Sequence, residues 1–157
     1  MISVDVKTTE PQTVAFLTMR GPYSQMPEAM GRLYGWAAQH GIRPTGMPSG
    51  VYMTDPATVG EDRAVWEVRA PLADDPPDAT PDASGCGIKH VESTLVAYTM
   101  YKGPYEQIAA TYEDMLAWMG ANGYSMAGPS EELYLSDPST TAPSEYLTEI
   151  RIPAARP

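Results

Sequence analysis

One four-residue segment occurs twice in this chain and sets a register for everything that follows it. Arg20-Gly21-Pro22-Tyr23 recurs as Lys102-Gly103-Pro104-Tyr105, 82 positions later. The same offset pairs two further sets of segments: Tyr52-Met53-Thr54-Asp55-Pro56 with Tyr134-Leu135-Ser136-Asp137-Pro138, and Val65–Pro71 with Leu147–Pro153. A gapless match over about 70 residues indicates an internal duplication.

The length of the repeat decides how the two copies are expected to pack. A unit of about 75 residues buries little apolar surface alone, so the 157 residues are expected to form one domain in which two copies pack around a pseudo-two-fold axis. We expect module 1 over residues 2–71, a polar, proline-rich linker over 72–85, and module 2 over 86–153.

Each copy is predicted to run strand, strand, helix, strand, strand, which places the domain in the α+β class. Apolar alternation over residues 2–6 and an apolar run from Val14 to Arg20 indicate two strands. A helix is expected from Ser24 to Gln39, ended by Gly41, with Gly123 in the same place in the second copy. Short strands over residues 50–54 and 65–70, separated by an Asp55-Pro56 turn and a loop, complete the copy.

Two related glutamates are the strongest candidates for chemistry. Glu67 and Glu149 each lie mid-strand between less polar neighbours, and alternation puts Arg69 beside the first and Arg151 beside the second. One interpretation is a pair of solvent-facing ion pairs of little energetic value. The other is a carboxylate on a concave sheet face that balances a ligand cation or acts as a general base.

Aromatic residues are the second candidate feature. The chain has ten Tyr and three Trp but one Phe, and many of these rings lie on the repeated elements. A tyrosine presents an apolar face and a polar tip, and a carboxylate inside an aromatic wall suits a delocalised organic cation. No Cys/His cluster has metal-ligand spacing, no glycine-rich phosphate loop is present, and Cys86 is the only cysteine, so we expect no metal or cofactor.

The repeated Gly-Pro-Tyr, the tryptophan-bearing helix, the Tyr-x-x-Asp-Pro turn and the closing Thr-Glu-Ile-Arg-Ile-Pro together resemble the GyrI-like small-molecule-binding family. That family includes effector-binding domains of AraC-type and multidrug-responsive transcription regulators. The resemblance covers residues 2–153 and implies two β-α-β-β-type modules related by a pseudo-dyad, an antiparallel sheet with two helices packed over it, and a central ligand groove. Without a helix-turn-helix segment, the chain is expected to be a stand-alone member.

The resemblance also assigns roles to residues. It places a glutamate at the base of the ligand site, at the position of Glu149, and thereby favours Glu149 over its counterpart Glu67. The aromatic walls are carried over, as an expectation, to the other candidate ligand-binding residues: Tyr23, Tyr105, Trp66, Tyr101 and Tyr134, with Trp118 and Met19.

Three functions remain open at this point. We favour binding of a bulky, aromatic and often cationic small molecule, with sequestration or sensing as the outcome. A second is hydrolysis of cyclopropane-bearing genotoxic compounds, with Glu149 or Glu67 activating a water. A third is a protein-interaction module of the gyrase-inhibitor kind.

Charge and hydropathy bear on partners and on location. The formal charge of −10, without a basic patch, argues against direct nucleic-acid binding. The sequence has neither a secretory signal nor an apolar run long enough to span a bilayer, so a cytoplasmic location is expected.

Overall fold

The computed structural model describes residues 3–54 and 59–156 and has an α+β fold, as the sequence predicts. The described residues form two α-helices, α1 (Met26–Gln39) and α2 (Ala109–Ala121), each preceded by a short 3-10 turn, η1 (Tyr23–Gln25) and η3 (Tyr105–Gln107). The strands are β1 (Asp5–Thr8), β2 (Gln12–Arg20), β3 (Ser49–Tyr52), β4 (Val65–Pro71), β5 (Cys86–Val91), β6 (Leu95–Lys102), β7 (Ser125–Met126), β8 (Ser130–Tyr134) and β9 (Leu147–Ala155). The Asp55-Pro56 turn expected from the sequence lies outside the described residues.

The elements follow the offset of 82 closely. β2 corresponds to β6, α1 to α2, β3 to β8 and β4 to β9, with ends that agree within two residues. Two further 3-10 turns, η2 (Glu61–Arg63) and η4 (Pro143–Glu145), are also 82 positions apart. The similar local sequences of the two halves therefore form the same local structures.

The chain divides into two compact units, one of residues 10–93 and the other of residues 1–9 with 94–157. In the first unit the strand order is β3-β4-β2-β5, and in the second it is β1-β6-β9-β8, with β7 also paired to β9. All these pairings are antiparallel. β1 thus pairs with β6, and β5 pairs with β2, so the first strand of each sequence repeat is built into the sheet of the other repeat.

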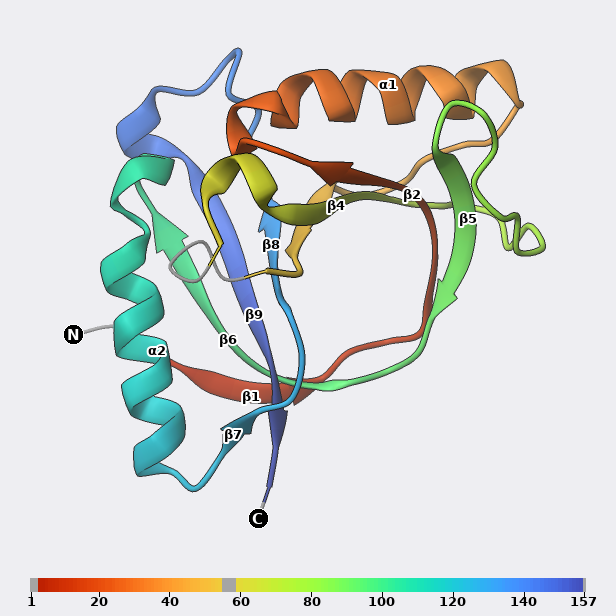
Figure 1. The fold of residues 1–157 in the computed structure, drawn as a ribbon. Coiled ribbons are helices and arrows are strands. Elements are labelled where there is room, and N and C mark those ends of the chain that lie inside the picture. Colours follow the sequence, from red (N-terminus) through yellow and green to blue (C-terminus); the bar gives the residue numbers. More distant parts are fainter. Residues whose placement is uncertain (1–2, 55–58, 157) are drawn as a thin grey trace. The chain divides into compact units, whose positions relative to one another are not determined.

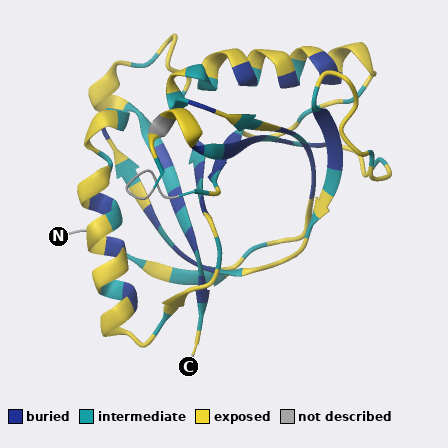
Figure 2. Ribbon diagram, viewed as in Figure 1, coloured by how far each residue is buried: buried dark blue, intermediate teal, exposed yellow. Residues whose placement is uncertain are grey.

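Each helix packs one apolar face onto the strands of its own unit. In the first unit α1 lies across β2 and β4 (Figure 1), where Leu33 and Ala37 pack with Leu17, Trp66 and Val68. The buried positions of each helix gather on one side of it (Figure 2). Full burial of one such aliphatic side chain contributes about 1.5–3 kcal/mol, so this face supplies most of the helix stability.

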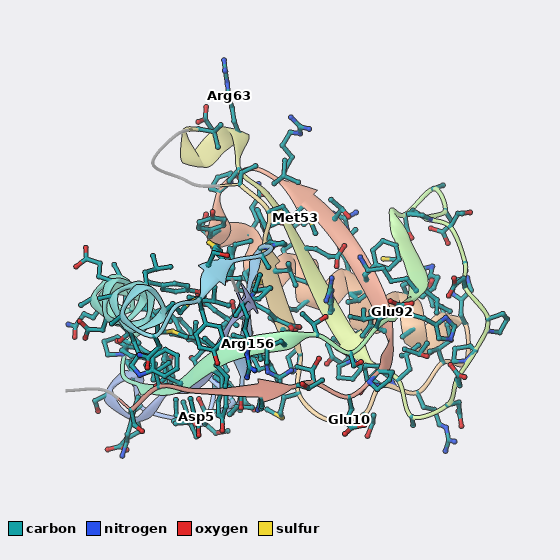
Figure 3. The ribbon with its side chains drawn as sticks, turned by 90° about the horizontal axis from the view of Figure 1, so that it is seen from below. Asp5, Glu10, Met53, Arg63, Glu92 and Arg156 are labelled. Carbon is teal, nitrogen blue, oxygen red and sulfur yellow. The ribbon has the colours of Figure 1, made fainter. Side chains whose placement is uncertain are left out.

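The core of the second unit repeats this arrangement. Met115 and Met119 of α2 pack against Ala97, Ile150 and Ile152. Each helix therefore has one apolar face, which packs against the core of its own unit. Both helices also end where expected, because Gly41 and Gly123 adopt positive φ angles of 65° and 81°. By contrast, a methionine outside the helices, Met53, is exposed (Figure 3).

Residues 72–85, expected to be a linker, are fastened to the first unit and are called the strap below. The backbone of Ala79 exchanges two hydrogen bonds with that of Ile88 on β5, 3.0 and 2.9 Å long. Asp82 accepts a 2.7 Å hydrogen bond from the indole of Trp36, and the carbonyl of Ser84 accepts one from Arg32. These contacts arise because the aspartates and main-chain groups of a polar segment can satisfy donors on α1 and β5.

A histidine holds the first part of the strap. The ring of His90 on β5 binds Asp75 through Nε2, at 2.6 Å, and Asp78 through Nδ1. Thr13, the strand partner of His90 on β2, donates a 2.5 Å hydrogen bond to Asp75. The hydrogen bonds to the two aspartates raise the pKa of His90, and those from Thr13 and His90 lower the pKa of Asp75.

No helix among residues 3–54 and 59–156 combines the length and the apolar character that a membrane crossing requires.

The His90 contacts predict a pH-dependent stability. With its pKa raised above the ordinary 6.5, the histidine contributes its full stabilisation below pH 6.5 and loses it as the pH rises through the raised pKa. Because the pKa of Asp75 is lowered, its carboxylate stays negatively charged and keeps its interaction with His90 until the pH falls well below 3.8. We expect the Tm of the wild type to fall between about pH 6 and 9, and His90→Gln to flatten this slope.

The control is His40→Gln, since His40 contacts the carbonyl of Trp36 and not the two aspartates. That variant should keep the slope. An unchanged slope in His90→Gln would show that the histidine does not carry the pH dependence. The measurement is thermal unfolding followed by circular dichroism across the pH range.

Candidate functional site

Glu149 lies on the sheet face that points away from α2, where two cations already contact it. Its carboxylate is 3.1 Å from Nζ of Lys7 on β1 and accepts a hydrogen bond from Nε of Arg151 on β9. The same Lys7 ammonium lies 4.1 Å from the ring centroid of Tyr98 on β6. The group ties three adjacent strands together.

Glu67 has the same surroundings in the first unit. Its carboxylate is 2.7 Å from Nζ of Lys89 and 2.5 Å from Nε of Arg69, and Lys89 lies 4.4 Å from the ring centroid of Phe16. Each of these four residues is 82 positions from its equivalent around Glu149: Lys89 and Lys7, Phe16 and Tyr98, Glu67 and Glu149, Arg69 and Arg151. Alternation predicted the pairing of Glu67 with Arg69, but Glu67 is 2% exposed, so the solvent-facing interpretation of it is wrong.

A third carboxylate, which the sequence argument did not select, lies on the opposite face of the strands of the second unit from Glu149. Glu132 on β8 is buried, with 8% of its surface exposed. One of its oxygens accepts a 2.6 Å hydrogen bond from the hydroxyl of Tyr112 on α2, and the other accepts a 3.3 Å bond from Tyr134. The hydroxyl of Tyr112 is also 3.5 Å from that of Ser130.

Aromatic rings continue from this carboxylate. The ring of Tyr105 meets that of Tyr134 edge to face at 5.7 Å and stacks on that of Tyr146 at 4.9 Å. The pKa of Tyr105 is raised by burial first, and then by Tyr146 and the charge of Glu132. Tyr105, Tyr112, Tyr134 and Tyr146 therefore form a tyrosine wall around one buried carboxylate, and these five residues are called the Glu132 cluster below.

The Glu132 cluster belongs to one half of the repeat. At the equivalent positions of the first half, Gly50 stands for Glu132, Met30 for Tyr112 and Ala64 for Tyr146. Only the other two tyrosines have tyrosine equivalents, Tyr23 for Tyr105 and Tyr52 for Tyr134. Glu132 is missed when candidate functional residues are sought only among those that both halves share. The sequence signal that identifies it is a glutamate at a position of a repeated strand where the other half has a glycine.

Besides Glu67, three of the predicted ligand residues lie in the first unit. Tyr23 packs its ring against those of Tyr52 and Trp66, at 5.1 and 6.1 Å. Trp66 is fully buried, and its indole donates a 2.9 Å hydrogen bond to the carbonyl of Gly21. The sulfur of Met19 lies 3.7 Å from Nη1 of Arg32. This group therefore contacts the Gly21-Pro22 turn and Arg32 of α1.

Besides Glu149, two predicted residues lie in the second unit but outside the Glu132 cluster. The hydroxyl of Tyr101 donates a 2.6 Å hydrogen bond to the carbonyl of Pro104, and burial raises the pKa of this phenol. The ring of Trp118 stacks on that of Tyr124 at 6.0 Å, and the guanidinium of Arg156 lies 5.7 Å from the centroid of the Tyr124 ring. Of the predicted aromatic residues, Tyr105 and Tyr134 are the two that contribute to the Glu132 cluster.

No group of three or more His, Cys, Asp and Glu side chains arranged to hold a metal ion occurs among the described residues. The single cysteine, Cys86, is buried, and burial raises the pKa of its thiol.

A family model for the GyrI-like small molecule binding domain matches residues 3–155. No curated protein matches the chain significantly. Among solved structures, the EcmrR C-terminal domain superposes with a TM-score of 0.84 at 16% identity, covering 100% of this chain and 99% of that one. In the structure of the EcmrR–DNA complex, this chain spans 58% of the EcmrR chain.

Two other structures share the fold. A hydrolase from Listeria innocua superposes with a TM-score of 0.70 at 17% identity, over 97% of this chain and 91% of that one. SAV2435, in a structure with bound tetraphenylphosphonium, superposes with a TM-score of 0.61 at 14% identity, over 98% of this chain and 94% of that one. At these identities the likeness shows the fold alone.

The ion pairs of Glu67 and Glu149 predict a stability effect. Replacing Glu67 with Gln removes a buried negative charge that Lys89 and Arg69 both contact, and is expected to destabilise the protein by roughly 1–3 kcal/mol. Glu149→Gln should cost less, because the side chain of Glu149 is 13% exposed against 2% for Glu67. Chemical denaturation measures both.

Glu113→Gln, on the exposed side of α2, is the matched control and should change stability by less than about 0.5 kcal/mol. If Glu67→Gln were as stable as this control, the carboxylate would not be a structural element of the sheet.

Proposed function

Since the chain belongs to the GyrI-like small molecule binding domain family, we propose that it binds a bulky, aromatic organic cation with Glu132 as the carboxylate that faces the charge. The observation that carries this proposal is a buried carboxylate hydrogen-bonded by tyrosine hydroxyls and flanked by tyrosine rings. Sensing or sequestration of the compound follows as the biological outcome.

The chemistry of the Glu132 cluster suits such a ligand. Three of its four tyrosines, Tyr105, Tyr112 and Tyr146, are half-buried, so their surfaces are in part accessible. Tyrosine faces attract a cation by about 0.5–2 kcal/mol each, according to how far it is desolvated. Stacking of apolar rings supplies further affinity, and the carboxylate supplies the charge preference.

The choice of Glu132 over Glu149 and Glu67 rests on the existing partners of each carboxylate. Lys7 and Arg151 contact Glu149, so a ligand cation would meet a region that already holds two positive charges. Glu132 instead accepts hydrogen bonds from two tyrosine hydroxyls and lies among four tyrosine rings, which are the aromatic surroundings that suit a delocalised cation. Ligand roles for Glu149, Glu67, Tyr23, Trp66, Tyr101, Trp118 and Met19 stay predictions, as does the groove expected between the modules.

The relatives support a role in sensing or capture. SAV2435 has been solved with an organic cation, and EcmrR in a complex with DNA. We propose that this chain has the ligand-binding role alone, without direct nucleic-acid contact, in the cytoplasm, and that any effect on transcription passes through a protein partner.

Hydrolysis is a second candidate function, favoured by the pairing of Glu132 with a hydroxyl at 2.6 Å. A carboxylate can take a proton from an attacking water while a tyrosine hydroxyl donates one to the developing oxyanion. A strained ring, such as a cyclopropane next to a carbonyl, is the substrate class that such a pair can open. The Listeria innocua hydrolase has the same fold.

Matched probes of one shape and opposite charge test the binding proposal. Tetraphenylphosphonium and tetraphenylborate differ chiefly in charge, and we expect the wild type to prefer the phosphonium. Glu132→Gln should weaken phosphonium binding by at least about tenfold, which is roughly 1.4 kcal/mol, and leave the borate unaffected or bound more tightly. Isothermal titration calorimetry gives the affinities, and ligand-induced changes in Tm give an independent check.

Glu131→Gln is the matched control, because residue 131 occupies the opposite face of the same strand and is partly exposed. It should retain the charge preference. Equal phosphonium affinity in Glu132→Gln and the wild type would refute the proposed role of Glu132. Mass spectrometry of mixtures with a cyclopropane-bearing ketone separates the two candidate functions, since only a hydrolase converts it to a product heavier by one water.

A further inference from the structure

Thr148 on β9 is a fully buried residue with a polar side chain. Its side chain is 0% exposed, and within residues 3–54 and 59–156 its Oγ1 makes no hydrogen bond. Buried hydroxyl groups in native proteins nearly always have a partner, because an unsatisfied one loses its hydrogen bonds to water without replacement. The presence of a hydroxyl group without a hydrogen-bond partner at this buried position therefore needs an explanation.

The register of the sheet places Thr148 beside the Glu132 cluster. Along β9, residues 148, 150 and 152 point to the same face, and Ile150 and Ile152 belong to the core under α2. Thr148 is the direct strand partner of Tyr134, while Glu132 is the partner of Ile150. Thr148 is therefore the diagonal neighbour of Glu132 on the face that holds the tyrosine wall, with Cα atoms about 7–8 Å apart.

Comparison with the first half explains why the hydroxyl is not needed for folding. The equivalent of Thr148 is Trp66, whose indole donates to the carbonyl of Gly21 in the Gly-Pro turn. In the second half the equivalent turn receives its hydrogen bond from Tyr101, the strand partner of Thr148 on β6, which donates to the carbonyl of Pro104.

The pair Met19 and Trp66 is thus replaced by Tyr101 and Thr148, and the polar contact to the turn moves to the other strand. A valine at position 148 would have the same shape and would serve the fold equally well. The change also replaces an indole with a much smaller side chain next to Tyr134.

We propose that Thr148 is a specificity-determining residue of the ligand site, whose hydroxyl binds a polar atom of the ligand close to the group held by Glu132. The inference rests on the proposed function and narrows it, because the ligand is then an aromatic cation that also carries a hydroxyl or carbonyl oxygen. Glu132 selects the charge and Thr148 selects the oxygen.

Two phosphonium probes test this division of roles. Tetraphenylphosphonium has no hydrogen-bonding atom, and (4-hydroxyphenyl)triphenylphosphonium adds one phenol to the same framework. The wild type should bind the phenol more tightly, by about three- to tenfold. Thr148→Val should abolish this difference and leave the affinity for tetraphenylphosphonium unchanged, while Thr148→Ser should preserve it.

A ligand-free measurement excludes a merely structural role. Replacing an unsatisfied hydroxyl by a methyl group of the same shape should leave the Tm of Thr148→Val equal to or above that of the wild type. A lowered Tm would show that the hydroxyl supports the fold, and would overturn the inference.

The binding outcomes separate the two proposals. If the wild type binds both probes equally, or if Thr148→Val loses affinity for both to the same extent, the inference about Thr148 is wrong and the binding function stands. If neither probe binds the wild type, the proposed function and this inference both fail.

Discussion

Alternation of side chains along β9 is the constraint on which the second unit depends. The strand pairs with β6, β8 and β7, so its two faces are fixed by hydrogen bonds on both edges. One face supplies Ile150 and Ile152 to the core and Thr148 to the neighbourhood of the Glu132 cluster, and the other supplies Glu149 and Arg151 to the ion pairs. A shift by one residue would exchange these faces, placing two charges under α2 and two isoleucines in the ionic cluster.

The repeated positions and the unrepeated ones have different roles in this chain. Both halves contain the Gly-Pro turn, the glycine that ends the helix, and the ion pairs with an aromatic neighbour. These features are repeated because both halves form the same helix and strands. Glu132, Tyr112 and Tyr146 occur in one half, where Gly50, Met30 and Ala64 show that the same elements form without them. Residues that the fold can do without are the better candidates for function.

This distinction explains what could be predicted from the sequence. The fold class, the two helices with the glycines that end them, and the pairing of Glu67 with Arg69 follow from local periodicity and from the repeat. The pairing of β1 with β6 and of β5 with β2 could not be predicted from the sequence. An offset of 82 shows which residues are equivalent, but it does not show which strands pair. The fastening of the strap depends on Trp36 and His90, whose positions beside Asp82, Asp75 and Asp78 are set by tertiary structure.

The proposed site follows from the sequence only in part. The family resemblance and the repeat point to Tyr105 and Tyr134, whereas Glu132 is identified through its contact with Tyr112 on α2, which joins residues 20 positions apart. Burying a carboxylate is costly unless its oxygens accept hydrogen bonds. The tyrosine hydroxyls that donate to Glu132 offset part of that cost. The proposed ligand cation would lie against this carboxylate and its tyrosine rings, so the negative charge and the aromatic faces would both favour a cation over a neutral compound of the same shape.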